Sequence, residues 1–365
     1  MRVGHFIETE MPGGAESVMI DLVLYAREQG FEPVLLHFGS EWVEAQAEQL
    51  GIEQAIIPEY ALFKSTKTLP LFAYKFSRFL KAQRIDILHS HLFGPITAAA
   101  PAAFLAGIAH VGTVHDVYMI EEKPARIRLM QLAAMLGTRL VAVSKHMEAF
   151  YRGAAYFSPQ GFSTIYNGIN PANYQPRSNK PAPKPDDKVR IICVGRLVAL
   201  KQVAVIVEQV LQLCESGMAV ELTVVGDGPE KEHITTLLAG HPQAQAIHML
   251  GARTDVAELL NSSDIFVQYS TTEGLSRSIL EAVAVGLPAI VSDVGGNAEI
   301  VDNHCGRLVS ASAPDQLKNA LAELIADAPL RASMGANGAL RIPAVFGRAL
   351  CNGQYKTLYQ QLYRA

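Results

Sequence analysis

Residues 190–216 have the sequence R-I-I-C-V-G-R-L-V-A-L-K-Q-V-A-V-I-V-E-Q-V-L-Q-L-C-E-S. The stretch opens with a short apolar run, 190–194, which predicts a buried strand. A loop containing a glycine follows, and then an amphipathic pattern that predicts a helix over 201–216. Short apolar runs and amphipathic stretches alternate in this way through most of the chain. Such alternation is typical of βαβ units, in which a parallel sheet carries helices on both faces.

The alternation occurs twice, once on each side of a proline-rich segment. In the first half we predict a helix over 15–29 and strands at 2–7, 33–38, 85–89, 111–114 and 140–143. In the second half we predict strands at 190–194, 220–225, 246–250, 265–268 and 289–291. Segment 171–188 holds five prolines and few apolar residues, as interdomain linkers do. Residues 344–363 carry aromatic and aliphatic side chains at helical spacing.

We therefore expect an α/β protein with two doubly wound, Rossmann-like domains, and a chain of 365 residues is long enough to give each a core. The predicted parts are an N-terminal domain (1–170), a linker (171–188), a second domain (189–342) and a terminal helix (343–365) that packs back on the first domain. Ligands of open α/β sheets bind beyond the carboxyl ends of the strands. Two such sheets facing each other would define a cleft.

Composition narrows the function classes. Apolar residues make up 49% of the chain and charged residues 18%, as in globular proteins, and the net charge of -4 argues against a dedicated nucleic-acid binder. The four cysteines lie far apart and form no CxxC pair, so a reducing cytoplasm is the simpler interpretation. No apolar run reaches the roughly 18 residues of a membrane-spanning helix.

Two cations follow the first strand of the second half. Arg196 lies in V-G-R-L, directly after that strand, and Lys201 comes five residues later. At the carboxyl end of a buried strand they could neutralise a pyrophosphate leaving group, which a guanidinium can bind with two parallel hydrogen bonds. The next strand ends in V-G-D-G-P (225–229), which is good turn chemistry in its own right. We interpret this turn as mainly structural.

The most specific stretch is E-G-L-S-R-S-I-L-E, residues 273–281, in which two carboxylates stand eight residues apart. Glu273 would lie in a loop, and the N–H groups of Gly274, Leu275 and Ser276 would open a helix toward an anion. Glu281, two turns into that helix, lies in an otherwise apolar run, and a buried carboxylate needs a partner. Facing the same cleft, it could accept both hydroxyls of a ribose.

The first half offers a glycine pair and several histidines. Gly13 and Gly14 come before a predicted helix, where glycines let a backbone approach a phosphate closely; an ordinary turn explains them equally well. His115 follows a strand and is placed to face the cleft. His89 and His91 end another strand. We expect these two to point to opposite faces and so not to form a ready metal site, with His91 on the acceptor side.

These motifs occur in an order that resembles the retaining glycosyltransferases of family 4, which have the GT-B fold. The resemblance rests on G-G-A-E, V-G-R-L with Lys201, V-G-D-G-P, E-G-L-S-R-S-I-L-E-A, G-L-P and D-V-G-G-N-A-E-I-V, and is strongest over 190–310. It implies metal-independent transfer of a hexose-type sugar from a nucleotide diphosphate, with retention of configuration. No other cofactor is implied. We expect UDP-sugar ahead of GDP-sugar, and a glycan or lipid-linked acceptor in envelope polysaccharide or glycolipid synthesis.

The resemblance also implies roles for individual residues. Arg196 and Lys201 would hold the donor phosphates, Glu281 the ribose, and Glu273 with the adjacent amides the transferred hexose. From the other domain, Gly13 and Gly14 would lie against the donor, and His115 would hydrogen-bond the sugar near the reacting carbon. His115 and Glu273 are thus the predicted catalytic pair.

Two residues depart from the family pattern. Gln202 stands where the family usually has glycine, which would change the turn slightly. Arg277 stands where the family usually has asparagine; it indicates either a charged donor sugar or acceptor, or a side chain that faces solvent.

Other functions fit the same composition. A nucleotide-sugar epimerase or a phosphorylase could share the two-domain architecture, although no Schiff-base lysine for pyridoxal phosphate is evident. A non-catalytic nucleotide-sugar-binding protein would be favoured by loss of Glu273 or Arg196, and both are present. A dinucleotide dehydrogenase is weaker, because G-x-G-x-x-G follows neither first strand.

Segment 69–84 predicts an amphipathic helix with aromatic residues along one side and basic residues flanking them. Residues 60–152 hold twelve Lys/Arg against five Asp/Glu. Such a helix can lie on an anionic membrane at its inner, cytoplasmic face. The alternative is that the aromatic side packs on the sheet, as surface helices of this fold must. We favour packing for the aromatic side, while the basic flank could still orient the protein toward a lipid-linked acceptor.

Overall fold

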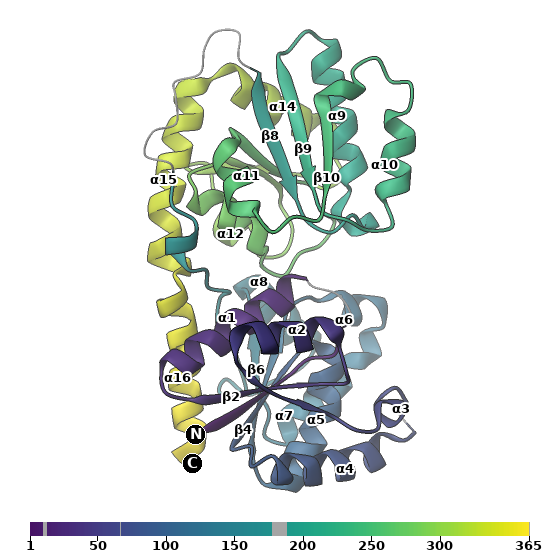
Figure 1. The fold of residues 1–365 in the computed structure, drawn as a ribbon, viewed down its shortest axis with the longest axis vertical. Coiled ribbons are helices and arrows are strands. Elements are labelled where there is room, and N and C mark those ends of the chain that lie inside the picture. The colour runs from purple at the N-terminus through teal and green to yellow at the C-terminus, as the bar shows by residue number, and fades with distance from the viewer. Residues whose placement is uncertain (10–12, 66, 177–187, 365) are drawn as a thin grey trace. The chain divides into compact units, whose positions relative to one another are not determined.

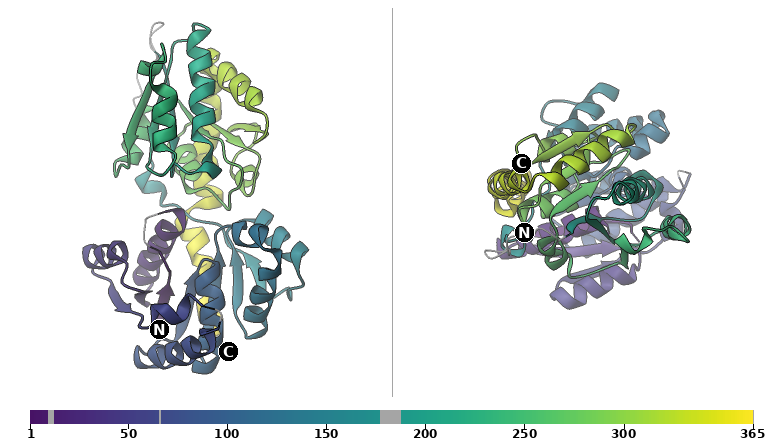
Figure 2. Two further views of the ribbon diagram at one scale, coloured as in Figure 1. Left: turned by 90° about the vertical axis from the view of Figure 1, so that its right-hand side faces the viewer. Right: turned by 90° about the horizontal axis from the view of Figure 1, so that it is seen from above.

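The computed structural model describes residues 1–9, 13–65, 67–176 and 188–364. The chain divides into two units, Met1–Gly168 with Ala349–Ala365, and Ile169–Arg348. Each unit is built around one parallel sheet with helices packed on it (Figures 1 and 2). Of the segment 171–188 predicted as a linker, 177–187 lie outside the described residues, and Pro171–Asn173 form a short 3-10 helix of the second unit.

The first unit holds a seven-stranded sheet in the order β3-β2-β1-β4-β5-β6-β7. Its strands are β1 (Arg2–Phe6), β2 (Glu32–His37), β3 (Glu53–Ile56), β4 (Ile87–His91), β5 (Ala109–Val114), β6 (Arg139–Ala142) and β7 (Phe162–Thr164). Its helices are α1 (Gly14–Glu28), α2 (Glu41–Leu50), α3 (Tyr60–Phe63), α4 (Leu69–Ala82), α5 (Phe93–Ala106), α6 (Tyr118–Glu122), a 3-10 turn (Pro124–Arg126), α7 (Ile127–Met135), α8 (Lys145–Ala154) and α16 (Arg348–Arg364).

The second unit holds a six-stranded sheet in the order β10-β9-β8-β11-β12-β13. Its strands are β8 (Val189–Val194), β9 (Val220–Val225), β10 (Ile247–Gly251), β11 (Ile265–Gln268), β12 (Ala289–Ser292) and β13 (Gly306–Val309). Its helices are α9 (Val203–Glu215), α10 (Lys231–Leu238), α11 (Val256–Ser262), α12 (Arg277–Ala284), α13 (Asn297–Ile300), α14 (Pro314–Ala326) and α15 (Ala328–Phe346), with 3-10 turns at Ala199–Lys201 and Ala244–Ala246.

Strand order reverses once in each sheet, between β1 and β4 in the first unit and between β8 and β11 in the second. The chain leaves the two strands at such a switch point in opposite directions, which opens a crevice at their carboxyl ends where α/β proteins bind ligands. The loops after β8 and β11, and those after β1 and β4, are therefore the places to look for a site.

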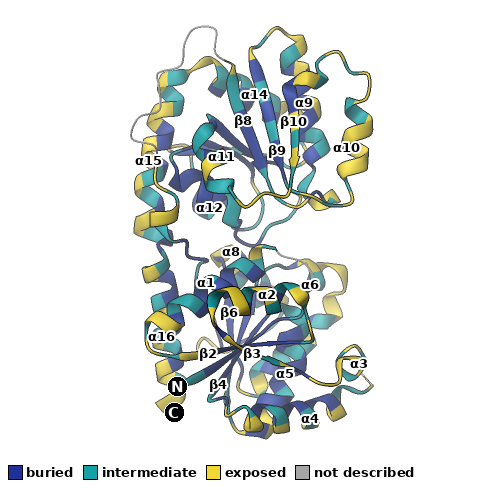
Figure 3. Ribbon diagram, in the orientation of Figure 1, coloured by how far each residue is buried: buried dark blue, intermediate teal, exposed yellow. Residues whose placement is uncertain are grey.

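Alternating side chains distribute the cores over both faces of the first sheet. Phe6 belongs to a cluster with α4 and α5, whereas the next residue, Ile7, belongs to a cluster with α1 and α2. Successive strand residues point to opposite faces, so one face carries α4 and α5 and the other α1 and α2. Figure 3 shows that the strands of both units are mostly buried.

The aromatic side of α4 contributes to the first of these clusters. Phe72 and Phe76 are 1% exposed and pack with Phe6. Burying two such rings is worth roughly 3–6 kcal/mol relative to leaving them in water. These rings hold α4 to its sheet and are not available to a membrane. No helix within the described part of the chain has the length and apolarity needed to cross a bilayer.

Three strands that the apolar pattern did not predict, β3, β7 and β13, all lie at sheet edges. Edge strands are buried less completely and so need fewer apolar residues; β3, for example, is mostly exposed. Pro343 does not begin a new helix, because α15 continues through it to Phe346 and α16 starts at Arg348. The buried Tyr355 and Tyr359 of α16 join the first unit's core.

Candidate functional site

The loops after β8 and β9 pack against each other through glycines. Gly226 and Gly228 have φ of +141° and +153°. A Cβ on Gly226 would lie 1.8 Å from the carbonyl oxygen of Gly195, and one on Gly228 would lie 2.4 Å from that of Leu197. Only glycine combines this backbone conformation with this closeness. The V-G-D-G-P turn thus holds the V-G-R-L loop in place, in keeping with the structural role predicted for it.

The predicted phosphate-binding cations lie in the loop after β8. Arg196 is exposed, and within the described ranges its side chain makes no hydrogen bond or ion pair; its backbone carbonyl accepts from the N–H of Val198. Lys201, in contrast, is mostly buried and its Nζ lies 2.5 Å from Oε1 of Glu273. The two loops at the switch point are also joined by a backbone bond from Thr271 to Leu200. The structure therefore brings together Lys201 and Glu273, which are 72 residues apart.

Gln268, which sequence analysis missed, connects Glu273 to the start of α12. Its Nε2 donates to Oε1 of Glu273, and its Oε1 accepts from the hydroxyls of Ser276, at 2.8 Å, and Ser278, at 3.2 Å. Gln268 is 3% exposed at the end of β11. The sequence did contain one signal that could have found Gln268: it is a polar residue at the end of the short apolar run I-F-V-Q, residues 265–268. Because both its amide nitrogen and its amide oxygen are hydrogen-bonded, Gln268 fixes the conformation of the E-G-L-S loop.

The E-G-L-S loop presents backbone N–H groups at the start of α12. Among described residues, the N–H groups of Gly274 and Ser276 have no acceptor. Two contacts hold this loop in place. Gly295 packs so closely that a Cβ on it would lie 1.8 Å from the carbonyl oxygen of Glu273, and the backbone N–H of Gly296 donates a hydrogen bond to the carbonyl oxygen of Gly274. Open amides at the N-terminus of a helix favour an anion. Leu275 lies between these amides and is itself buried.

Glu281 lies on α12 and is 8% exposed. Its Oε1 accepts hydrogen bonds from the Tyr174 hydroxyl and from Nε of Arg277, each at 2.8 Å. Arg277 therefore does not simply face solvent: its side chain is 17% exposed and forms an ion pair within the helix. The partner that the buried carboxylate needs comes from the same helix and from residue 174, which sequence analysis did not single out.

Gln202, where the family pattern would place glycine, adopts a backbone conformation that suits glycine. Its φ is +43°, in the left-handed region, just before α9 begins. A non-glycine residue costs roughly 1–2 kcal/mol in this conformation. The predicted change in turn geometry is thus not required, because the backbone adopts the conformation that suits glycine.

In the first unit, the predicted glycine pair begins α1. Gly13 is the N-cap and Gly14 the first helical residue. A Cβ on Gly14 would meet no described residue within 4 Å, so packing within the described part of the chain does not require glycine there. A ligand that packs against the start of α1 would leave no room for a Cβ at Gly14 and would therefore require glycine.

The expectation that His89 and His91 point to opposite faces is wrong. Residues i and i+2 of a strand share a face, and the two rings stack with centroids 4.2 Å apart. His5 lies opposite His89 on β1, and ring nitrogens of the three lie within 4.8 Å of one another, close enough to hold a metal ion. We call His5, His89 and His91 the histidine cluster. Both nitrogens of His89 are already hydrogen-bonded, to Tyr359 and Thr113.

His115 adjoins the histidine cluster. Its Nε2 lies 3.2 Å from Nδ1 of His91, whose Nε2 is buried with no partner among the described residues. Burial lowers the pKa of His115 to about 4 and holds that of His91 well below its usual range. Both imidazoles are therefore neutral near pH 7, and a neutral imidazole can donate or accept one hydrogen bond to a sugar hydroxyl.

Helix α16 reaches the cluster from the far end of the sequence. The Tyr359 hydroxyl lies 2.5 Å from Nδ1 of His89, and the Tyr355 hydroxyl lies 3.0 Å from Oγ1 of Thr113. Thr113 in turn bonds Nε2 of His89. The network fixes the carboxyl ends of β4 and β5, next to His91 and His115. His89 and Tyr359 are 270 residues apart, so their contact could not be predicted from the spacing of residues along the sequence.

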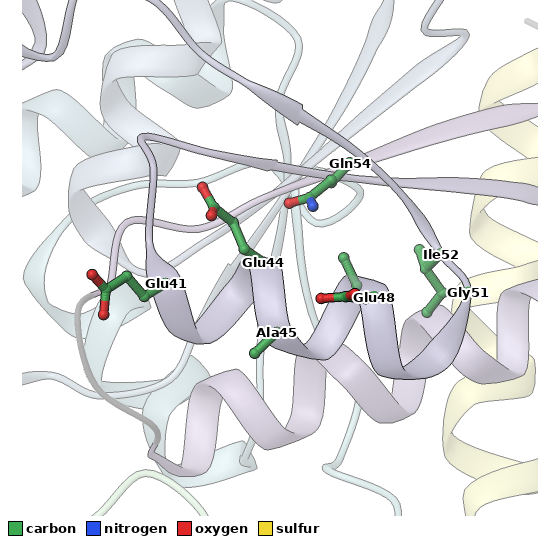
Figure 4. Close-up of a pocket in the computed structure, with 8 residues that line it drawn as sticks. Glu41, Glu44, Ala45, Glu48, Gly51, Ile52 and Gln54 are labelled. Atoms are coloured by element: carbon green, nitrogen blue, oxygen red, sulfur yellow. The ribbon is translucent and has the colours of Figure 1, made fainter.

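A hollow of about 600 Å³ elsewhere in the first unit does not suit a phosphate. Figure 4 shows Glu41, Glu44 and Glu48 on α2 and Gln54 on β3 at its edge. Three carboxylates in this small space would repel an anion. The residues predicted to bind a nucleotide-sugar do not line it.

Two doubly wound parallel sheets, with cations and helix amides at the switch point of the second, define a GT-B glycosyltransferase. Residues 175–341 match the family described as glycosyl transferases group 1, and residues 12–173 match glycosyltransferase family 4. The chain belongs to glycosyltransferase family 4 and is an enzyme of this class.

Named relatives agree with this class. The chain is 30% identical over 290 residues to UDP-Gal:alpha-D-GlcNAc-diphosphoundecaprenol alpha-1,3-galactosyltransferase of Escherichia coli, covering 73% of this chain and 72% of that one. It is 24% identical to N-acetyl-alpha-D-glucosaminyl L-malate synthase of Bacillus anthracis, covering 96% and 95%. The crystal structure of Anabaena HepE with UDP and glucose has the same fold, with a TM-score of 0.84, 20% identity and coverage of 98% and 99%. The epimerase, phosphorylase and binding-protein alternatives are not favoured.

Proposed function

We propose that this glycosyltransferase transfers a hexose-type sugar from a nucleotide diphosphate, with retention of configuration and without a metal ion, to a sugar or lipid-linked sugar. The arrangement at the β8–β11 switch point carries the proposal: Lys201 against Glu273, open amides at the start of α12, and Glu281 two turns further on. UDP is the favoured nucleotide, since the Escherichia coli relative is named for UDP-Gal and the Anabaena structure holds UDP.

On this proposal, Lys201 changes partner when the donor binds. Its ammonium neutralises Glu273 in the free protein, and a pyrophosphate, with more charge, competes for it. Once Lys201 has moved to the pyrophosphate, the Glu273 carboxylate can accept hydrogen bonds from hydroxyls of the hexose. Arg196, exposed nearby, adds a second cation to the phosphates, so charge developing on the leaving group meets groups already in place.

Retention would follow if the acceptor attacks on the face from which the phosphate leaves, with a phosphate oxygen taking the acceptor proton. Within the first unit, Gly13, Gly14 and His115 keep their predicted donor-side roles, and His91 its acceptor-side role, as proposals. The named acceptor of the Escherichia coli relative is a lipid-linked sugar, which supports an acceptor of that kind and a role in envelope polysaccharide or glycolipid synthesis.

Calorimetric titration with UDP and GDP tests the donor site. Glu281→Ala should weaken nucleotide binding about ten-fold or more, since a lost charge-assisted bond to a buried group costs roughly 1.5–3 kcal/mol. Glu273→Ala should leave UDP binding at least as strong as in the wild type, because Lys201 is then no longer held by Glu273, and it should suppress transfer. Glu323→Ala is the matched control, because Glu323 pairs with Arg307 at the surface of the same unit. Unchanged UDP affinity in Glu281→Ala would refute the assignment.

Excess chelator tests the metal-free step, and it should leave the initial transfer rate almost unchanged. An enzyme that recovers only with manganese or magnesium would show that the leaving group is stabilised differently. NMR of the anomeric proton in the first product reports the configuration, and an inverted product would contradict retention.

A further inference from the structure

The two oxygens of the Glu281 carboxylate have different surroundings. Both protein donors, the Tyr174 hydroxyl and Nε of Arg277, go to Oε1. Among the described residues Oε2 has no hydrogen-bond donor. A carboxylate offers two acceptor positions on each oxygen, so two donors occupy Oε1 and leave both positions of Oε2 open.

Arg277 and Tyr174 suit this one-sided arrangement. Arg277 lies one helical turn before Glu281, and the side chains of this ion pair are only 17% and 11% exposed, so solvent screens it less than an ordinary surface pair. Burial and the Glu281 charge raise the pKa of Tyr174, which keeps its hydroxyl protonated as a donor. The two donors arrive from different segments, and together they restrict rotation of the carboxylate more than either could alone.

We propose that Arg277 and Tyr174 are positioning residues that hold Glu281 with Oε2 directed to the vicinal diol of the donor ribose. The inference rests on the proposed donor site and extends it. Oε2 can accept from both the 2′ and the 3′ hydroxyl, so the pair sets how strongly the enzyme prefers a ribonucleotide to a deoxyribonucleotide. Arg277, already held by Glu281, recognises no charge on the donor sugar or the acceptor in this scheme.

The experiment measures affinity of the full chain for UDP and for 2′-deoxy-UDP. The wild type should prefer UDP by about ten-fold, the value of one charge-assisted bond. Arg277→Asn and Tyr174→Phe should weaken UDP by roughly five-fold and three-fold, because a misdirected carboxylate loses part of that bond. They should weaken 2′-deoxy-UDP less than UDP, because only the bond to the 3′ hydroxyl remains to be disturbed. The preference for the ribonucleotide then falls, which a general loss of stability would not produce.

A double-mutant cycle identifies the route of the effect. In a Glu281→Ala background, Arg277→Asn should cause no further loss, since Arg277 acts through that carboxylate. Arg277→Lys should fail to restore the preference, because an ammonium lacks the Nε–H that lies 2.8 Å from Oε1. Arg307→Asn is the control: Arg307 forms a similar pair with Glu323 away from the site.

Each outcome decides a different point. Equal weakening of both nucleotides in Arg277→Asn, or an additive loss in the double variant, overturns the positioning role while leaving the donor site standing. Unchanged affinities in both Arg277→Asn and Tyr174→Phe overturn it as well. If Glu281→Ala binds UDP like the wild type, the donor site itself is wrong and the inference fails with it. A thermal melt of each variant verifies that it is folded.

Discussion

Acidification from pH 7.5 to pH 5 should destabilise the first unit, because its sheet buries histidines in the neutral form. Burial lowers the pKa of both His5 and His110 to about 3. In the unfolded chain their pKa returns to roughly 6.5. Between these values the unfolded chain binds more protons than the folded one, so stability is full above about pH 6.5 and is lost as the pH falls toward 3.

The magnitude follows from the difference in protonation. At pH 5, about 1.5 units below the unfolded pKa, each such histidine costs about 2 kcal/mol. His5 and His110 together cost about 4 kcal/mol, and His115, with a pKa of about 4, acts in the same direction. Total stability of a domain is only about 5–15 kcal/mol. The loss is therefore a large fraction of what holds the unit folded, at a pH where most carboxylates are still ionised.

Urea unfolding followed by tryptophan fluorescence measures this effect. The chain has a single tryptophan, Trp42, and it lies on α2, so the signal reports the first unit. The free energy of unfolding should fall by about 4 kcal/mol or more between pH 7.5 and pH 5. A decrease of less than about 1 kcal/mol would refute the argument, since two buried neutral imidazoles cannot give so small a change.

His5 provides a sharper test. Its two ring nitrogens have no partner among the described residues, so His5→Leu removes a titrating group without breaking a hydrogen bond. The variant should lose about 2 kcal/mol of the pH dependence and be no less stable at pH 7.5. His233→Ala, exposed on α10, is the control and should leave the pH dependence unchanged.

Two further predictions concern the loop after β8 and the surface of α4. Gln202→Gly should raise the free energy of unfolding by about 1 kcal/mol, since glycine adopts the left-handed backbone at 202 without a Cβ penalty; urea melts of the second unit that show no gain would contradict this. Contact with anionic vesicles should be weak and abolished by salt, because Lys64 and Lys75 already pair with Glu8 and Glu59. Flotation at low and high salt measures it, and no binding at low salt would remove the proposed membrane contact.

The sequence by itself determined the parts of this protein that depend on local pattern. Alternating apolar runs and amphipathic stretches indicated two sheets of parallel strands, since strand and helix periodicities are properties of neighbouring residues. The positions of Arg196, Glu273 and the glycine pair directly after strands followed from the same pattern, because strand ends are where such sheets bind ligands.

Tertiary structure alone decided which of these residues meet. Lys201 reaches Glu273 because β8 and β11 become neighbours at the switch point and bring the loops after them together. Tyr174 reaches Glu281 across 107 positions, a contact that only the folded chain makes. The three edge strands that the apolar pattern did not predict, β3, β7 and β13, formed through pairing with a neighbour, with few apolar residues of their own. Tyr359 meets His89 because α16 returns to the first unit's core, and the partner of a buried polar group depends on that packing and not on spacing along the chain.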